Sequence, residues 1–150
     1  MKMISFNTFS LLSLIALVCL ATGCNGNVKV SGTVKLEDGT PIQSGRVIFE
    51  QDTFSAVGAI ENGKYQMGTL KENDGLPRGE YIVYINGAMK PGEQFEVANG
   101  INSETGQANM VQMTTFSPLV AKEYTEVQSS PLRCKVEKSM TFDIVVPASE

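Results

Sequence analysis

The sequence contains no histidine and no tryptophan, and each absence limits the functions available to the chain. Without histidine there is no Ser-His-Asp triad, no Cys-His nucleophile and no histidine-ligated zinc site. Without tryptophan, a sugar-stacking platform or an aromatic cage for cations is poorly supported. Basic residues are also scarce, since 12 Lys and Arg stand against 16 Asp and Glu, for a net charge of −4. The chain therefore lacks the basic footprint of a nucleic-acid-binding protein.

Motifs for phosphate, calcium and catalytic carboxylate sites are missing as well. The chain has neither GxxxxGK[ST] nor GxGxxG, and its acidic turns lack the alternating ligands and closing glutamate of an EF-hand loop. Glu72, Asp74 and Glu80 gather around residues 71–79. A glycosidase pair would need a cleft with aromatic walls, so we interpret these acids as solvated turn residues. We expect no enzyme, no catalytic residues, no cofactor and no metal.

The first 23 residues have the order of an export signal. Lys2 precedes residues 11–20 (LLSLIALVCL), which are almost purely apolar, and the small residues of 21–23 follow. The apolar run is too short to cross a bilayer core, which needs about 20 residues. It also offers only Ser13 as a polar face for a buried helix. The pattern therefore predicts a secretory signal peptide over residues 1–23.

Cys24 comes directly after these small residues, and residues 20–24 (LATGC) resemble the lipobox of bacterial lipoproteins. The resemblance implies cleavage before Cys24, attachment of diacylglycerol to its thiol and acylation of the new amine. Several acyl chains on one residue anchor a protein stably. The alternative is an ordinary secreted protein with a free Cys24. Because Asn25 replaces the Asp that implies inner-membrane retention in some bacteria, we expect a lipid anchor in the outer membrane, at its periplasmic or surface face.

After cleavage, Cys134 would be the one cysteine with a free thiol. Apolar and charged residues alternate over 132–136 (LRCKV), and this phase places Cys134 in the core as a small hydrophobic side chain. A disulfide would form only if Cys24 escaped acylation and reached Cys134.

A period of two dominates the chain from residue 28 onward, and no stretch of ten residues has apolar residues at helical spacing. Asn62-Gly63 predicts a type I′ hairpin, and Gly32, on the apolar face of the first strand, indicates a close backbone approach. The last two strands are expected to form a hairpin. The sequence therefore predicts an all-β fold, a single antiparallel β-sandwich of about seven strands. The predicted strands cover 28–36, 46–50, 54–60, 64–70, 80–86, 131–136 and 140–146.

Residues 87–113 interrupt this pattern, because they contain four glycines and many amides and keep no sustained period. They predict a long loop that either carries a binding function or packs on its own sandwich. Residues 116–124 fit either a short helical turn or an extended edge. The apolar residues of the loop make it the best candidate for binding, and they are Met89, Phe95, Val97, Ile101, Met110, Val111 and Met113.

Four short segments carry a resemblance to a known domain: 30–41 (VSGTVKLEDGTP), 45–49 (GRVIF), 62–65 (NGKY) and 76–83 (LPRGEYIV). They resemble the carboxypeptidase regulatory-like domain, a transthyretin-like (prealbumin-like) β-sandwich common in bacterial cell-surface lipoproteins. The resemblance implies that fold and a surface location, and it implies no catalytic residues. Independently of it, Gly79 allows a sharp turn that lets Tyr81 bury its ring and return its hydroxyl to the backbone, and Tyr65 is expected to behave similarly.

These observations predict a signal peptide over 1–23, an anchor and linker over 24–27, a sandwich over 28–146 with the long loop 87–113, and a tail over 147–150. The expected function is that of a non-enzymatic, lipid-anchored cell-envelope protein, a structural or interaction module. The alternative is a periplasmic or surface lipoprotein that binds a ligand, peptide or glycan through loop 87–113. The expected partners are the membrane, through Cys24, and an unidentified envelope protein or glycan, but no nucleic acid.

Overall fold

The computed structural model describes residues 26–68 and 74–150, and in this part the fold is all-β, as predicted. Regular structure other than strand is limited there to a short 3₁₀ helix, η2 (Lys122–Tyr124). The strands are β1 (Val30–Leu36), β2 (Ser44–Gln51), β3 (Phe54–Glu61), β4 (Lys64–Gln66), β5 (Gly79–Asn86), β6 (Met89–Ile101), β7 (Ala108–Pro118), β8 (Arg133–Val136), β9 (Met140–Thr141) and β10 (Ile144–Val146).

Eight of these strands form one curved sheet, in the order β10-β1-β4-β3-β2-β5-β8, with β9 also pairing with β1. The pairs along this order are antiparallel except at β1, which pairs in parallel with both β9 and β10. The expectation of a purely antiparallel sheet was therefore wrong at this edge. Local alternation fixes which side chains face inward, but it carries no information on the direction of a distant partner strand.

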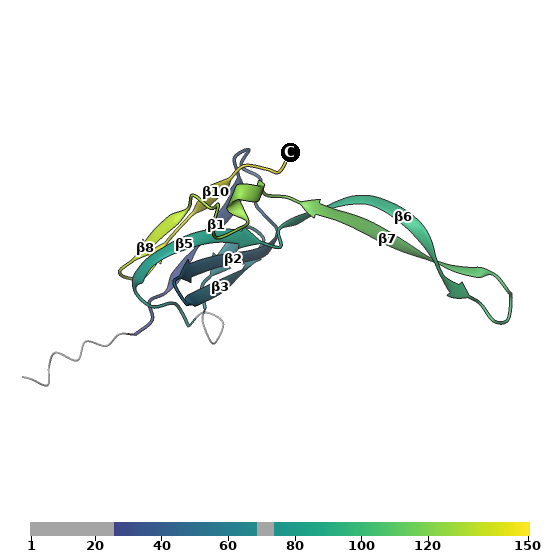
Figure 1. The fold of residues 1–150 in the computed structure, drawn as a ribbon, viewed down its shortest axis with the longest axis horizontal. Coiled ribbons are helices and arrows are strands. Elements are labelled where there is room, and N and C mark those ends of the chain that lie inside the picture. Colours follow the sequence, from purple (N-terminus) through teal and green to yellow (C-terminus); the bar gives the residue numbers. More distant parts are fainter. Residues whose placement is uncertain (1–25, 69–73) are drawn as a thin grey trace, which may run out of the picture.

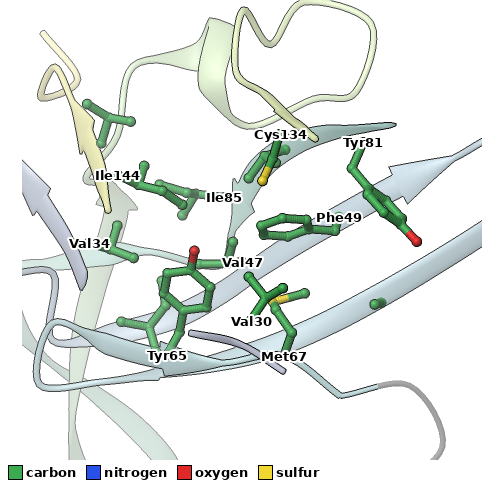
Figure 2. Close-up of a cluster of buried hydrophobic side chains, with 14 of the residues drawn as sticks. Val30, Val34, Val47, Phe49, Tyr65, Met67, Tyr81, Ile85, Cys134 and Ile144 are labelled. Carbon is green, nitrogen blue, oxygen red and sulfur yellow. The ribbon is translucent and has the colours of Figure 1, made fainter. Parts of the chain in front are cut away.

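The sheet closes over a single hydrophobic core, which gives the body the character of a sandwich or barrel. The Phe49 ring on β2 lies 6.4 Å from Tyr65 on β4, 5.8 Å from Tyr81 on β5 and 5.9 Å from Phe142, measured between ring centroids. Phe142 lies between β9 and β10, at the far side of the strand order, so the sheet must curl to bring these rings together. Figure 2 shows side chains of β1, β2, β4, β5, β8 and β10 gathered in one cluster.

Two tyrosines bury their rings and return their hydroxyls to backbone carbonyls, as predicted, but the Tyr65 hydroxyl reaches Phe142 and not across the hairpin at 62–63 that was expected. The Tyr81 hydroxyl donates a hydrogen bond to the Pro77 carbonyl oxygen at 2.8 Å. The Tyr65 hydroxyl donates to the Phe142 carbonyl oxygen at 2.6 Å. Both rings are almost fully buried, so each hydroxyl satisfies its hydrogen-bonding need without water.

The predicted turn at Asn62-Gly63 is confirmed, with positive φ angles of 51° and 77° joining β3 directly to β4. The predicted close approach at Gly32 is also confirmed. A Cβ atom there would lie 2.0 Å from the Phe142 carbonyl oxygen, which no side chain tolerates.

The chain after Cys134 differs from the predicted hairpin. Residues 140–146 form two short strands, β9 and β10, that pair with β1, whereas β8 pairs with β5. The interruption falls at Phe142 and Asp143, where Asp143 Oδ1 accepts hydrogen bonds from the Thr33 amide and hydroxyl, both at 2.8 Å. The side-chain oxygen therefore binds β1 where the backbone ladder is broken, and the final segment adds to the first strand instead of the preceding one.

The prediction of a long loop over 87–113 was also wrong. Most of this segment is extended, and β6 and β7 pair with each other to form a separate two-stranded sheet, the ribbon (Met89–Pro118). The ribbon projects far beyond the sandwich (Figure 1). Its turn is held by Asn102, whose side-chain oxygen accepts hydrogen bonds from the amides of Glu104 and Thr105. Both alternatives for 116–124 occur in succession, because β7 ends at Pro118 and η2 follows.

Candidate functional site

The ribbon is the most apolar exposed feature in the described part of the chain. Seven of the nine large hydrophobic side chains that are exposed there lie on it, and the other two are Val57 and Val145. None of the buried core residues comes from the ribbon. The exposed fractions on the ribbon are 48% for Met89, 45% for Phe95, 72% for Ile101, 53% for Met110, 38% for Val111, 50% for Met113 and 66% for Phe116.

In the middle of the ribbon the two faces differ in polarity. Phe95 pairs with Met113, and Val97 pairs with Val111, so these four side chains share one face. We call this set the apolar face. On the opposite face, Gln94 and Glu96 of β6 pair with Thr114 and Gln112 of β7. A ribbon with one apolar and one polar face is the pattern of a half-buried sheet, yet in the described part of the chain Phe95, Val111 and Met113 of the apolar face are exposed.

The ribbon has no stabilising layer of its own. A single two-stranded hairpin is marginally stable in water, and more strands or a packed layer are normally needed. The ribbon pairs strands of 13 and 11 residues, and at its base the Leu119 amide donates a hydrogen bond to the Ala88 carbonyl oxygen, at 2.9 Å, which continues this pairing into the sandwich. Its exposed apolar side chains and its open strand edges are therefore available to a partner.

The base of the ribbon borders a hollow of about 430 Å³. Asn86, Met89 and Pro118 line one part of it, and Lys122 and Glu126 bring charges of both signs to the rest. Pockets for small molecules have volumes of roughly 300–1,000 Å³ and combine apolar walls with a few polar groups. This hollow is the described feature that best matches the alternative function as a ligand carrier.

Cys134 lies in the core, as predicted, with 3% of its surface exposed and its side chain among the labelled core residues of Figure 2. Burial raises the pKa of its thiol to about 11. The thiol is therefore protonated at neutral pH and is a poor nucleophile. A second hollow, of about 480 Å³, lies beside it against Tyr81 and Arg133.

Two of the three acidic residues singled out around 71–79 fall within the described residues. Glu80 lies exposed on β5, Asp74 lies in the loop before that strand, and Glu72 falls outside the described residues. Within residues 26–68 and 74–150, no three His, Cys, Asp or Glu side chains come close enough together to hold a metal ion. Glu80 lines the hollow beside Cys134, and neither Glu80 nor Asp74 belongs to such a ligand set.

The predicted signal peptide and Cys24 also fall outside the described residues. The described chain starts at Gly26, whose carbonyl oxygen accepts a hydrogen bond from Arg78 Nη1 at 3.3 Å. Arg78 directly precedes β5, which starts at Gly79 and ends at Asn86, close to the first residue of the ribbon. Gly26 and the ribbon therefore lie at opposite ends of the sandwich, as Figure 1 shows. Among the described residues, no helix has the length and hydrophobicity needed to span a membrane.

Sequence reasoning selected the apolar residues of the ribbon but missed their arrangement. The signal was present as two short alternations, Phe95-Glu96-Val97 and Val111-Gln112-Met113. Register irregularities at 91–94 and 98–101 shift the phase of β6 and hide its full length. The comparisons with known proteins add no assignment, because no family model, no curated protein and no solved structure matches the chain.

Proposed function

We propose that the protein is a non-enzymatic, lipid-anchored component of the cell envelope whose β-sandwich presents the ribbon to a protein partner. The observation that carries this proposal is the concentration of exposed apolar side chains on a projecting ribbon that contributes nothing to the core. Large exposed apolar surfaces on soluble domains mark interaction sites. The sandwich serves as a rigid platform and the ribbon as the contact element.

The anchor part of the proposal rests on the export signal and on Cys24 within the sequence LATGC. An anchor at Cys24 would hold the Gly26 end of the sandwich near the membrane. The ribbon leaves the opposite end of the sandwich, so it would extend away from the anchor point. Its turn, residues 102–107 (NSETGQ), is polar and bears Glu104, which disfavours insertion into lipid. A protein partner therefore suits the ribbon better than a lipid surface.

The finer fold assignment, a transthyretin-like sandwich of the carboxypeptidase regulatory-like type, belongs to the same proposal. Its support is the sequence resemblance together with an all-β sandwich-like body in which Tyr81 returns its hydroxyl to the backbone. The absence of histidine and the raised pKa of the Cys134 thiol support a role without catalysis and without a cofactor.

A second candidate function is that of a ligand carrier, which the hollow at the base of the ribbon favours. A small ligand with both apolar and charged groups would contact Met89, Lys122 and Glu126 there. In this case the substitution Lys122→Ala would abolish binding, whereas changes on the apolar face, farther along the ribbon, would leave it intact.

The test compares proteins cross-linked to the full chain in intact envelopes. The double variant Phe95→Ser and Met113→Ser removes half of the apolar face, and Val57→Ser with Val145→Ser is the matched control, because these valines are exposed on the sandwich at 43% and 46%. We expect cross-linked partners to disappear with the ribbon variant and to remain with the control. Equal recovery from both variants would overturn the interaction proposal.

The anchor is tested by fractionation of Cys24→Ser. We expect this variant to appear as soluble protein or as uncleaved precursor, whereas the parent chain requires detergent for extraction. Membrane retention of a fully processed Cys24→Ser chain would contradict lipid attachment at this residue.

A further inference from the structure

The two outer edges of the ribbon differ in their readiness to pair with another strand. β6 carries Lys90, Pro91, Glu93 and Glu96. It also contains both register irregularities of the ribbon, since three residues of β6 span two of β7 at 91–94 and again at 98–101. Edge charges, proline and β-bulges are the devices by which natural edge strands avoid pairing. The outer edge of β6 is therefore protected against strand addition.

β7 has none of these devices along its length. Its sequence, ANMVQMTTFSP, contains no charged residue and no glycine, and its one proline is the last residue, Pro118. Its 11 residues include none of the extra residues of the two bulges. A long, uncharged and regular edge strand is a template for another strand.

The β7 sequence is also complementary to itself. When β7 pairs antiparallel with β7 of a second copy about Gln112, Val111 lies opposite Met113 of the second copy, and Met113 lies opposite its Val111. These residues belong to the apolar face, so the two apolar faces join into one. The opposite face then pairs Gln112 with itself and Met110 with Thr114. No like charges meet in this register, because β7 contains no charged residue.

We propose that the partner of the ribbon is a second copy of this chain, bound through the β7 edge into a four-stranded sheet β6-β7-β7-β6. This inference rests on the proposed function, which makes the ribbon the contact element. The antiparallel register also brings the ribbon turn of each copy, at Gly106, to the ribbon base of the other, at Pro118. Four strands with a joined apolar face satisfy the need for additional strands that a lone hairpin does not meet.

The length of β7 sets the strength and shape of this dimer. In this register residues 108–116 of each β7 pair with each other, and nine residues span about 31 Å, so the contact buries less than the roughly 800 Å² per partner of a standard interface. The dimer therefore dissociates at micromolar concentrations in solution, and confinement to a membrane surface favours it through a higher effective concentration. It is elongated, with the two Gly26 ends at its extremes, so it lies along a membrane instead of standing on it.

The experiment is chemical cross-linking of the full chain bearing Gln112→Cys, carried out in envelopes with a short bifunctional maleimide. Residue 112 meets itself across the two-fold axis, so we expect a covalent homodimer. The parent chain and Gln94→Cys, on the protected strand β6, give the background. Adding Thr114→Lys to Gln112→Cys places a charged side chain opposite Met110 of the second copy and lowers the dimer yield, whereas Gln94→Lys in the same background leaves the yield unchanged.

The other outcomes separate this inference from the proposed function. Cross-linking of Gln112→Cys to a different protein overturns the self-pairing but leaves the ribbon as an interaction element. If the Gln112→Cys chain reacts with only one maleimide of the reagent and forms no cross-linked adduct in envelopes, the self-pairing and the role of the ribbon as an interaction element are both overturned. A dimer that persists with Thr114→Lys overturns the β7 register.

Discussion

The hydroxyl of Tyr65 donates a hydrogen bond to the carbonyl oxygen of Phe142 at 2.6 Å, across 77 residues of sequence. The same carbonyl lies over Gly32 on β1, where no side chain would fit. This contact therefore holds the chain between β9 and β10 against the first strand and fixes the parallel edge of the sheet.

The first prediction concerns this hydrogen bond. Tyr65→Phe leaves the Phe142 carbonyl oxygen without its tyrosine donor in the core, and we expect a loss of about 1–3 kcal/mol in the free energy of unfolding. The measurement is urea denaturation. Tyr84→Phe is the control, because its hydroxyl donates to Glu50 at 2.8 Å in a more exposed place and should cost less. Equal losses for both variants would mean that the Tyr65 contact has no special role.

The second prediction concerns the buried thiol of Cys134. Thiol reagents should label it only after denaturation. Cys134→Ala is expected to cost about 1 kcal/mol and Cys134→Asp several, because the first leaves a small cavity and the second buries a charge. Labelling of the native protein at the rate of a free thiol would place this strand at an exposed edge.

The third prediction is the alkaline dependence of stability. Burial raises the pKa of Cys134 from 9.0 to about 11, so the folded state holds this proton more tightly than the unfolded state. The stabilisation is complete below pH 9 and is lost as the pH rises from 9 to about 11. Cys134→Ala should flatten this part of the profile, as measured by urea denaturation at each pH. Burial also raises the pKa of Tyr65, so part of the decline above pH 10 should remain.

The fourth prediction concerns the independence of the sandwich from the ribbon. Replacing residues 91–116 by Asn-Gly joins Lys90 to Ser117, which are already paired, and removes no buried core residue. We expect cooperative unfolding with Tm within about 5 °C of the parent chain. The core variant Val34→Ala, measured in the same way by calorimetry, shows how far the Tm falls when buried packing is lost. A shortened chain that no longer unfolds cooperatively would show that the ribbon supports the body.

The sequence allowed the strand pattern and the buried residues to be predicted where local alternation and turn chemistry suffice. Val28 to Leu36, the Asn62-Gly63 turn, the fit at Gly32 and the burial of Cys134 all follow from neighbours in the chain. The parallel pairing of β10 with β1 did not follow, because it joins residues more than 100 positions apart.

The ribbon was missed for a different reason. A strand is recognised by an unbroken period of two, and the bulges at 91–94 and 98–101 break that period while the chain stays extended. A ribbon that projects from its domain also lacks the buried face that normally fixes the pattern. Its polar and apolar residues are thus not constrained by packing against the core.

The central claim, that the ribbon is an interaction surface, is tested most directly by comparing two exposed valines. Val111→Cys on the ribbon and Val57→Cys on β3 replace side chains with similar exposed fractions, 38% and 43%. The measurement is the rate of maleimide labelling at each position, in intact envelopes and in dilute detergent solution. We expect Val57→Cys to react at the same rate in both, and Val111→Cys to react at least tenfold more slowly in envelopes. Equal rates for Val111→Cys in both settings would contradict the account.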